Sequence, residues 1–362
     1  MGYVNFSIAC NRFSVRKMPQ FSKYQVIEKI AECDLISSFV LAPTDGLEVP
    51  SFVAGQHLTV RIPEGLSRSY TISSSPSDRS KYRLTIKHEK GRDAEMPAGK
   101  VSTFMHDRVS VGSVLDIAGP YGAFHLDPTS DRPVVLLSGG VGITPMISML
   151  HVLADTTRQV SFVHACDNGT LHAFHDEVGR LATTRPGISC YFIYRNPTAA
   201  DLEDQRHHSS GLVTANQLRA FSAQDSDFYL CGPSGFMQMV HDGLTDAGVS
   251  HDRIRYESFG PATVLSPRSQ AVQSKVTEAL VVFEGSGLEV EWDDFSGSLL
   301  DFAEMNGVYA ESACRSGSCN TCECSLLEGQ VDYLIEPAAP LPAGRCLPCV
   351  AKPASVKVRL DI

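Results

Sequence analysis

The sequence of 362 residues contains no apolar stretch long enough to span a membrane. Its first 20 residues lack the apolar core of a secretory signal, and they contain basic but no acidic side chains. The net charge of −10 disfavours nucleic acid and anionic membranes as partners. We therefore expect a protein of the reducing cytoplasm, with a disordered leader over residues 1–21.

The cysteines do not form the pattern of a disulfide framework. Six of the eleven lie between residues 314 and 349, and the other five are scattered. Cys314, Cys319 and Cys322 have a C-x4-C-x2-C spacing, which together with a distant Cys349 is typical of a plant-type [2Fe–2S] cluster. Small residues at 316–318 would let backbone N–H groups point at the sulfurs. This pattern predicts an iron–sulfur centre.

Two other interpretations of these cysteines remain open. Cys319 and Cys322 with Cys346 and Cys349 would also form the paired C-x2-C motif of a zinc ribbon. That interpretation leaves Cys314 without a role and the glycine–serine loop unexplained. Purely structural thiols are the third interpretation, which the density of cysteines disfavours.

Residues 22–127 are predicted to form a small antiparallel barrel. Segments 58–62 and 82–86 alternate apolar and polar residues with period two, as half-buried strands do. Turn-forming clusters at 43–46 and 75–78 separate the predicted strands.

Within this region Arg68, Ser69, Tyr70 and Thr71 stand side by side on a predicted strand. Arg68 can pair with a phosphate, Tyr70 can pack on a ring system, and Thr71 can hydrogen-bond near a reactive nitrogen. This combination suits a flavin, although a solvent-facing strand would explain the motif taken alone.

A second phosphate-binding candidate lies at residues 99–102. Gly99 is followed by Val101 and by Ser102, which we predict to be the N-cap of a helix that starts near Phe104. The N-terminus of that helix would face an anion.

Residues 128–261 alternate buried strands with helices, which predicts a parallel sheet with crossover helices. The strands are expected at 134–137, 160–164, 191–194 and 228–231, and the helices at 146–154, 173–181 and 235–247. The ligand of such a fold lies at the carboxyl ends of the strands.

A glycine-rich turn follows the first of these strands. Gly139, Gly140 and Gly142 would let the backbone approach a pyrophosphate, although the spacing is not the standard G-x-G-x-x-G. Thr144 is predicted to be the N-cap of the next helix, and Pro145 its first residue.

Asp167 follows the second strand of this region, where an acidic residue can bind ribose hydroxyls and repel a 2′-phosphate. We therefore predict a preference for NADH over NADPH. The alternative is a solvated turn aspartate beside Asn168 and Gly169.

Residues 262–275 lack periodicity and contain Ser, Pro and Gln, so we interpret them as a linker. Residues 276–362 contain the cysteine loop. Strands are expected there at 279–283, 288–292 and 356–360, and a helix at 299–305.

Four motifs together resemble the ferredoxin–NADP⁺ reductase superfamily: Arg68–Thr71, Ser138–Pro145, Phe228–Pro233 and Tyr256–Pro261. The likeness is strongest to the reductase half of flavohaemoglobins, without the globin half, so no haem is expected. The tail resembles the plant-type ferredoxin domain of oxygenase reductases. This resemblance implies a six-stranded antiparallel β-barrel for FAD, a Rossmann-like α/β domain for NAD and an α+β β-grasp ferredoxin domain.

The resemblance also implies roles for single residues. It assigns Arg68, Ser69, Tyr70, Thr71, Gly99, Val101 and Ser102 to FAD, and Gly139, Gly140, Gly142, Thr144 and Pro145 to the nicotinamide dinucleotide. Cys231, Gly232 and Pro233 would lie where nicotinamide meets flavin, and Glu257 and Phe259 near the isoalloxazine. Thr71, Cys231 and Glu257 are the expected catalytic residues. Cys349 matches the closing ligand, with Cys346 as its rival.

The expected function is electron transfer from NAD(P)H through FAD to a [2Fe–2S] cluster and then to a partner protein. The favoured partner is a terminal oxygenase of the Rieske or another non-haem iron type. The alternative acceptor is a hybrid-cluster or nitrogen-oxide-handling protein. An alternative from a different functional class is a zinc-stabilised flavin-binding module with a regulatory function.

Overall fold

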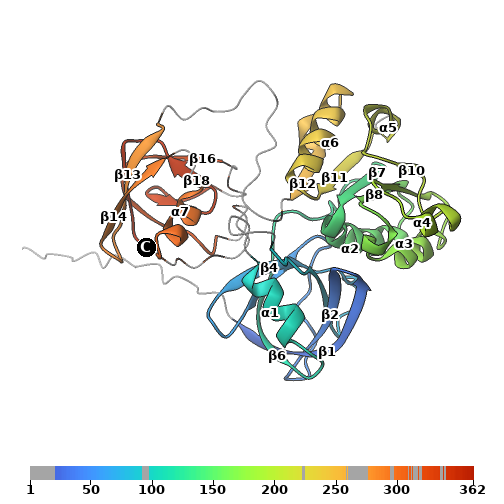
Figure 1. Cartoon of the computed structure of the whole chain (residues 1–362), viewed down its shortest axis with the longest axis horizontal. Helices are drawn as coiled ribbons and strands as arrows, with labels where there is room; N and C mark the ends of the chain where they lie inside the picture. The colour runs from blue at the N-terminus through green and yellow to red at the C-terminus, as the bar shows by residue number, and fades with distance from the viewer. Residues whose placement is uncertain are drawn as a thin grey trace, which may run out of the picture.

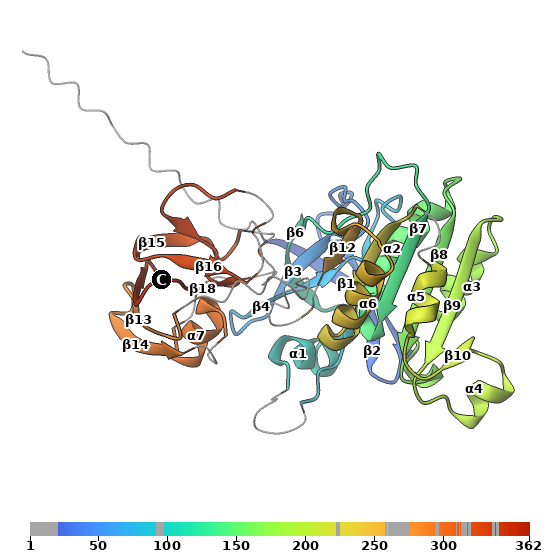
Figure 2. The same ribbon diagram turned by 90° about the horizontal axis from the view of Figure 1, so that it is seen from above.

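The computed structural model describes residues 21–91, 98–221, 225–257, 259, 276–293, 297–308, 310, 312, 317, 320–334, 337 and 340–362. Its elements form three groups, coloured blue to cyan, green to yellow and orange to red in chain order (Figure 1). The orange-to-red group lies to one side of the other two in both views (Figure 2). The predicted linker at 262–275 and all but the last residue of the predicted leader lie outside the described residues.

The first group is a six-stranded antiparallel sheet, as predicted. Its elements are β1 (Ser22–Cys33), β2 (Ile36–Pro43), β3 (His57–Arg61), β4 (Ser67–Thr71), β5 (Tyr82–Lys87), α1 (Lys100–Arg108) and β6 (Val114–Tyr121). The strand order is β4-β3-β6-β1-β2-β5. A bridge between Ile72 and Leu84 joins the two edges and closes the sheet into a barrel. Alternating side chains such as Leu58 and Val60 fill its interior.

The second group is a six-stranded parallel sheet with helices on both faces. Its strands are β7 (Val134–Gly139), β8 (Val160–Cys166), β9 (Ile188–Tyr194), β10 (Ser209–Ser210), β11 (Asp227–Cys231) and β12 (Ile254–Glu257), in the order β10-β9-β8-β7-β11-β12. The helices are α2 (Ile143–Ala154), α3 (His175–Ala182), α4 (Ala199–Glu203), α5 (Ala215–Phe221) and α6 (Ser234–Asp246). Residues of α2 and α3 share one apolar core with the sheet, and residues of α5 and α6 share the other. In the described parts of the chain, no helix is long and apolar enough to cross a membrane.

Two predicted helix caps are wrong. Helix α1 has Gly99 as its N-cap, and Ser102 is the third residue inside it. The Ser102 hydroxyl instead donates to Gly99 O at 3.0 Å and accepts from Glu89 N at 3.3 Å. This local bonding ties the start of the helix to the segment after β5.

The cap of α2 is also displaced, because the glycine turn is itself a 3₁₀ turn (η1, Gly140–Gly142) that runs directly into the helix. Gly142 is therefore the N-cap, and Thr144 is the second helical residue. Pro145 is the third residue, still within the first turn, where its missing N–H has no helical partner to lose.

The third group has its own apolar core. It comprises β13 (Glu278–Phe283), β14 (Leu288–Asp293), α7 (Leu299–Met305), β15 (Cys324–Glu328), β16 (Val331–Tyr333), β17 (Arg345–Cys346), β18 (Ala351–Pro353) and β19 (Lys357–Leu360). Five strands form a mixed sheet in the order β14-β13-β19-β15-β17, and β16 pairs with β18. Ser298 caps α7 in a capping box with Asp301. Trp292, the single tryptophan, is 1% exposed in this core.

The barrel and the parallel sheet are joined by a half-buried ion pair. Arg83 of β5 donates to both carboxylate oxygens of Glu177 in α3, at 2.7 and 2.8 Å. His151 Nε2 of α2 lies 2.7 Å from Glu177 Oε1, and the Arg83 guanidinium lies 4.6 Å from the centre of the Phe174 ring. Burial by itself raises the pKa of Glu177, but the bonds from His151 and Arg83 outweigh burial and lower it to about 2.

We expect Glu177→Gln to destabilise the folded chain at neutral pH, by up to about 3 kcal/mol, because the folded carboxyl titrates well below its ordinary value. A depressed carboxyl pKa stabilises the fold above the unfolded pKa of 4.5 and loses that contribution as pH falls towards about 2. The urea-unfolding midpoints of wild type and variant should therefore differ at pH 7. The difference should begin to shrink as the pH falls below about 4.5.

The control is Asp176→Asn, because the neighbouring Asp176 side chain is 83% exposed. We expect that change to move stability by no more than about 0.5 kcal/mol. A Glu177→Gln deficit that stayed constant down to pH 3 would contradict the proposed linkage.

Candidate functional site

A cleft of about 440 Å³ lies at the carboxyl ends of the parallel strands, where the parallel sheet meets the barrel. Ile36 and Lys87 line it from the barrel, and Gly139, Gly140 and Pro233 line it from the sheet. The predicted glycine turn thus faces a cavity that two groups of elements share. This is the edge at which open α/β sheets bind their ligands.

The glycines of this cleft are required by close backbone approach. A Cβ atom on Gly142 would collide with the carbonyl of Cys231, and one on Gly139 would lie 3.0 Å from Phe236 Cδ1. A Cβ atom on Gly232 would lie 2.8 Å from the same ring. Gly140 has a φ of +53°, which glycine adopts at little cost. Bare backbone at these positions suits a pyrophosphate.

Asp167 lies in the wall of the cleft, with its side chain 35% exposed. Arg195 Nε and Asn196 Nδ2 each donate to Asp167 Oδ1 at 2.9 Å. Both contacts use the same oxygen and hold the carboxylate at the end of β8. Neither of these two contacts uses Oδ2.

Two buried histidines hydrogen-bond side chains near the carboxyl ends of the parallel strands. His164 Nδ1 lies 2.8 Å from Ser138 Oγ, which ties the ends of β8 and β7 together. His172 Nδ1 lies 2.8 Å from Tyr194 OH. Burial lowers the pKa of His164 to about 3, so this residue is neutral at physiological pH.

The predicted flavin motif lies on β4. Thr71 is 3% exposed, and its buried hydroxyl has no hydrogen-bond partner among the described residues. A buried orphan hydroxyl costs free energy unless a ligand satisfies it, so this position fits a flavin. Burial also raises the pKa of Tyr70, and the Ser69 and Thr59 hydroxyls lie 3.4 Å apart.

The predicted pyrophosphate segment lies at the start of α1. A Cβ atom on Gly99 would lie 2.7 Å from Ser102 Oγ and 3.1 Å from Glu89 Cβ, so a larger residue there would displace these side chains. Val101 and Ser102 are buried in the first turn of the helix. The turn is therefore held rigidly, as a phosphate site needs.

The structure adds His57, which the sequence did not single out. His57 and Thr71 are direct neighbours across β3 and β4, and His57 is 2% exposed. His57 Nδ1 lies 3.9 Å from Glu257 Oε1 at the end of β12. Glu257 in turn pairs in register with Cys231 of β11. Thr71 and the two expected catalytic residues of the sheet therefore converge through His57.

Burial raises the pKa of the Cys231 thiol well above its ordinary value, and the nearby Glu257 adds to the effect. The thiol is therefore neutral and suits contact with an uncharged ring. Phe259, expected near the isoalloxazine, is 41% exposed.

The described half of the predicted cluster ligands fits a metal centre. Cys322 and Cys349 are 5% and 4% exposed and belong to one apolar cluster. Asn320 has a φ of +55° and Gly317 a φ of +74°, in the left-handed region that glycine adopts at little cost and asparagine tolerates better than most residues. Cys314 and Cys319 lie outside the described residues.

Cys346 is placed differently from Cys349. It is fully buried in the main core of the third group, with its Sγ 3.6 Å from Cys324 Sγ. Leu347 and Val350 lie with Cys349 in the other cluster. Of the two rivals, the geometry therefore favours Cys349 as the fourth ligand.

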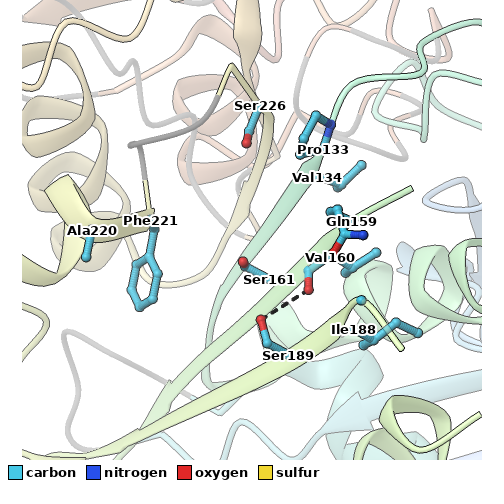
Figure 3. A pocket seen from close by; sticks show the side chains of 11 residues that line it. Pro133, Val134, Gln159, Val160, Ser161, Ile188, Ser189, Ala220, Phe221 and Ser226 are labelled. Atoms are coloured by element: carbon cyan, nitrogen blue, oxygen red, sulfur yellow. Dashed lines mark hydrogen bonds between the residues drawn. The ribbon is translucent and has the colours of Figure 1, made fainter. Parts of the chain in front are cut away.

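A second cavity of about 300 Å³ lies at the opposite edge of the parallel sheet (Figure 3). Val134, Val160 and Ile188, at the amino ends of β7, β8 and β9, line it, and Ser189 Oγ donates to Val160 O at 3.3 Å. None of the predicted site residues lines this cavity.

Three family models match the chain in order. Residues 23–126 match the oxidoreductase FAD-binding domain, residues 136–242 the oxidoreductase NAD-binding domain, and residues 281–354 the 2Fe-2S iron-sulfur cluster binding domain. These matches confirm the predicted cofactors: FAD, a nicotinamide dinucleotide and a [2Fe–2S] cluster. They also confirm the three-part fold and overturn the zinc-ribbon alternative.

Among curated proteins, a flavohemoprotein of Bacillus cereus is 43% identical over 253 residues, which are 68% of this chain and 62% of that protein. The chain thus spans about three fifths of the length of the curated relatives it matches.

Two solved structures are also similar. The flavohem-like FAD/NAD-binding domain of nitric oxide dioxygenase from Vibrio cholerae is 35% identical, with 66% of this chain and 99% of that chain covered and a TM-score of 0.59. Phthalate dioxygenase reductase is 24% identical, with 94% and 98% covered and a TM-score of 0.61. The second likeness concerns the fold alone.

We expect Cys349→Ser to abolish the electron paramagnetic resonance signal of the reduced cluster. Cys346→Ala should keep that signal, because its sulfur faces Cys324 and not the ligand cluster. Flavin content measured in the same samples controls for general misfolding. The reverse pattern would assign the fourth ligand to Cys346.

Proposed function

Because the chain belongs to the ferredoxin–NADP⁺ reductase superfamily, we propose that it is a reductase that passes electrons from NAD(P)H through FAD and a [2Fe–2S] cluster to a terminal oxygenase. The observation that carries this proposal is the cleft that contains the glycine turn, because its walls come from both the barrel and the parallel sheet. A shared cleft would bring a nicotinamide bound on the sheet to a flavin bound on the barrel.

The residues of the cleft have separate tasks in this proposal. The glycine turn binds the pyrophosphate by backbone N–H groups, and Asp167 binds the adenosine ribose. Gly232 packs against Phe236 without a side chain, and the proposal places the nicotinamide ring beside it and Cys231. When bound, FAD accepts a hydride from the nicotinamide and the cluster carries single electrons.

In this proposal Thr71 and Glu257 would supply polar groups to the bound flavin and nicotinamide. When FAD is bound, the Thr71 hydroxyl would hydrogen-bond it, and this bond would satisfy the buried oxygen. His57 lies between Thr71 and Glu257 and positions the Glu257 carboxylate across the junction of barrel and sheet. We assign Thr71, Cys231 and Glu257 as catalytic residues and His57 as their positioning residue.

The charge of the third group supports a protein as the electron acceptor. Residues 276–362 contain fourteen Asp and Glu against five Lys and Arg, so they carry nine of the ten net negative charges of the chain. A strongly acidic electron-exit domain favours a partner with a basic docking surface. We place this encounter in the reducing cytoplasm.

A second candidate acceptor is a nitrogen-oxide-handling or hybrid-cluster protein. The observation that favours it is the 43% identity to a flavohemoprotein over the FAD- and NAD-binding part. An experiment distinguishes the two candidates. The purified chain is mixed with each class of acceptor under anaerobic conditions, and the rates of acceptor reduction are compared.

The route of the electrons is tested by a chain that ends at Ser266, before the cluster domain. We expect it to keep FAD and to reduce ferricyanide with NADH, since a small acceptor reaches the flavin directly. It should lose most of its reduction of cytochrome c and of the partner.

Adding the separate 276–362 fragment should restore only part of that rate, because covalent linkage supplies a high effective concentration. Trp292 fluorescence reports whether the fragment is folded, since this tryptophan is buried in its core. Full partner reduction by the truncated chain would show that the cluster is not the exit.

The coenzyme preference is tested at Asp167. We expect wild type to have a higher kcat/KM for NADH than for NADPH. Asp167→Asn should shrink that ratio by about tenfold, because it removes a charge-assisted bond to the ribose and the repulsion of a 2′-phosphate. Asp204→Asn, an exposed residue at the end of α4, is the control and should leave the ratio unchanged. A wild-type preference for NADPH would refute the assignment.

A further inference from the structure

Cys324 and Cys346 face each other inside the third group of elements. They are direct partners in the antiparallel pairing of β15 with β17. Both side chains are 0% exposed, and their sulfurs lie 3.6 Å apart.

The geometry of this pair suits a covalent bond. Residues directly opposite in an antiparallel ladder have Cα atoms about 4.5–5.5 Å apart, which lies within the range that disulfides span. A disulfide has an S–S length of about 2.05 Å, so the two sulfurs need to approach by only about 1.5 Å. Side-chain rotation provides such a movement without a change of strand register.

The pair also lies between the two segments that carry predicted cluster ligands. We call these segments the ligand arms: the residues from Cys322 to Cys324, and the residues from Cys346 to Cys349. Cys322 precedes Cys324 by two residues, and Cys349 follows Cys346 by three. Arg345 reinforces this strand pair with bonds from its side chain to Glu323 Oε1 at 2.7 Å and to Ser325 Oγ at 2.8 Å. A bond between the two sulfurs would therefore tie one ligand arm to the other.

The packing explanation accounts for only part of this arrangement. A buried cysteine often serves as a small apolar side chain, and both residues belong to the apolar core around Trp292. Packing alone would be satisfied by alanine or valine at either position. It does not require two thiols in sulfur–sulfur contact beside a predicted redox centre.

We propose that Cys324 and Cys346 are a redox modification site, which forms an intramolecular disulfide after the cluster is lost and holds the two ligand arms in place. The oxidant is a low-molecular-weight disulfide such as glutathione disulfide. The cluster-loss condition rests on the proposed function, whereas the disulfide itself does not.

The chemistry is two successive thiol–disulfide exchanges. One cysteine sulfur, after losing its proton, attacks a sulfur of glutathione disulfide, forms a mixed disulfide and releases one glutathione. The second cysteine sulfur then attacks the protein-bound sulfur and releases the other glutathione. Two electrons pass from the cysteine sulfurs to glutathione disulfide, and the two thiol protons end on the two glutathiones.

Loss of the cluster would let glutathione disulfide reach the two sulfurs, which are inaccessible in the folded domain. Both sulfurs are fully buried, so glutathione disulfide reaches them only through local opening. Strand β17 is an edge strand of two residues, so opening it breaks few ladder contacts. A ligated cluster would hold the ends of both arms and suppress this opening.

The experiment uses the full-length chain with its cluster and after removal of iron by a chelator. Both forms are incubated with glutathione disulfide, and remaining thiols are then alkylated. The chain is then digested under non-reducing conditions with trypsin and with a protease that cleaves after glutamate. This digestion separates Cys322 from Cys324, because Glu323 lies between them. The expected product joins peptide 324–328 to peptide 346–357, because trypsin does not cleave between Lys352 and Pro353, and fragment ions distinguish Cys346 from Cys349.

We expect this linkage to form in the iron-free chain at a rate on the order of tenfold or more above that of the holoprotein. Dithiothreitol should reverse it, and Cys324→Ala and Cys346→Ala should each prevent it. Cys190→Ala, at a half-buried position on β9, is the matched control and should leave it unchanged.

A second measurement separates redox protection from packing. Iron-free wild type, exposed to glutathione disulfide, then reduced and given iron and sulfide, should regain more cluster absorbance than Cys346→Ala treated identically. The two chains should recover equally if the oxidation step is omitted.

A dominant linkage between Cys322 and Cys349, or glutathione adducts without an internal bond, would overturn the proposal. Equal rates with and without iron would overturn the dependence on cluster loss. If the purified chain held no iron or sulfide, the proposed function would fail, but the peptide linkage would still report on the disulfide.

Discussion

The site depends on a steric constraint at the carboxyl ends of β7 and β11, where two backbones meet without side chains between them. A Cβ atom on Gly142 would collide with the Cys231 carbonyl, so these strand ends approach only as glycine permits. This close approach brings the predicted phosphate-binding turn next to the position expected for the nicotinamide. The adjacent β12 then places Glu257 beside Cys231, within reach of the barrel residue His57. One packing requirement thus sets the relative positions of groups from four strands.

Much of the fold could be predicted from local periodicity. The strands at 134–137 and 228–231 and the helix at 299–305 match the observed elements to within two residues, since buried parallel strands and amphipathic helices have strong sequence patterns. Helix caps were less predictable. Ser102 and Thr144 have the residue types of N-caps, but the glycines before them start each helix earlier.

The contacts that join the parts of the molecule were not predictable, because strand register and domain docking do not appear in one-dimensional patterns. His57 looks like an ordinary strand residue until its pairing with Thr71 is known. Arg83 and Glu177 are 94 positions apart in the chain, and nothing local connects them. The pattern of residue types therefore predicted flavin and dinucleotide motifs separately, whereas only the coordinates bring Thr71, Glu257 and Cys231 together through His57.

The cysteines show how equal spacing can hide unequal roles. Cys319 and Cys322 have the same C-x2-C spacing as Cys346 and Cys349, so spacing alone allowed four thiols to converge on one zinc ion. In the structure Cys349 lies in the apolar cluster of Cys322, whereas Cys346 belongs to β17 and faces Cys324 across the ladder. The turn over residues 347–350, closed by a bond from Val350 N to Leu347 O, sends the two thiols of the second pair in different directions. Because a zinc ribbon needs both members of each pair, this turn disfavours it and leaves Cys346 available for chemistry of its own.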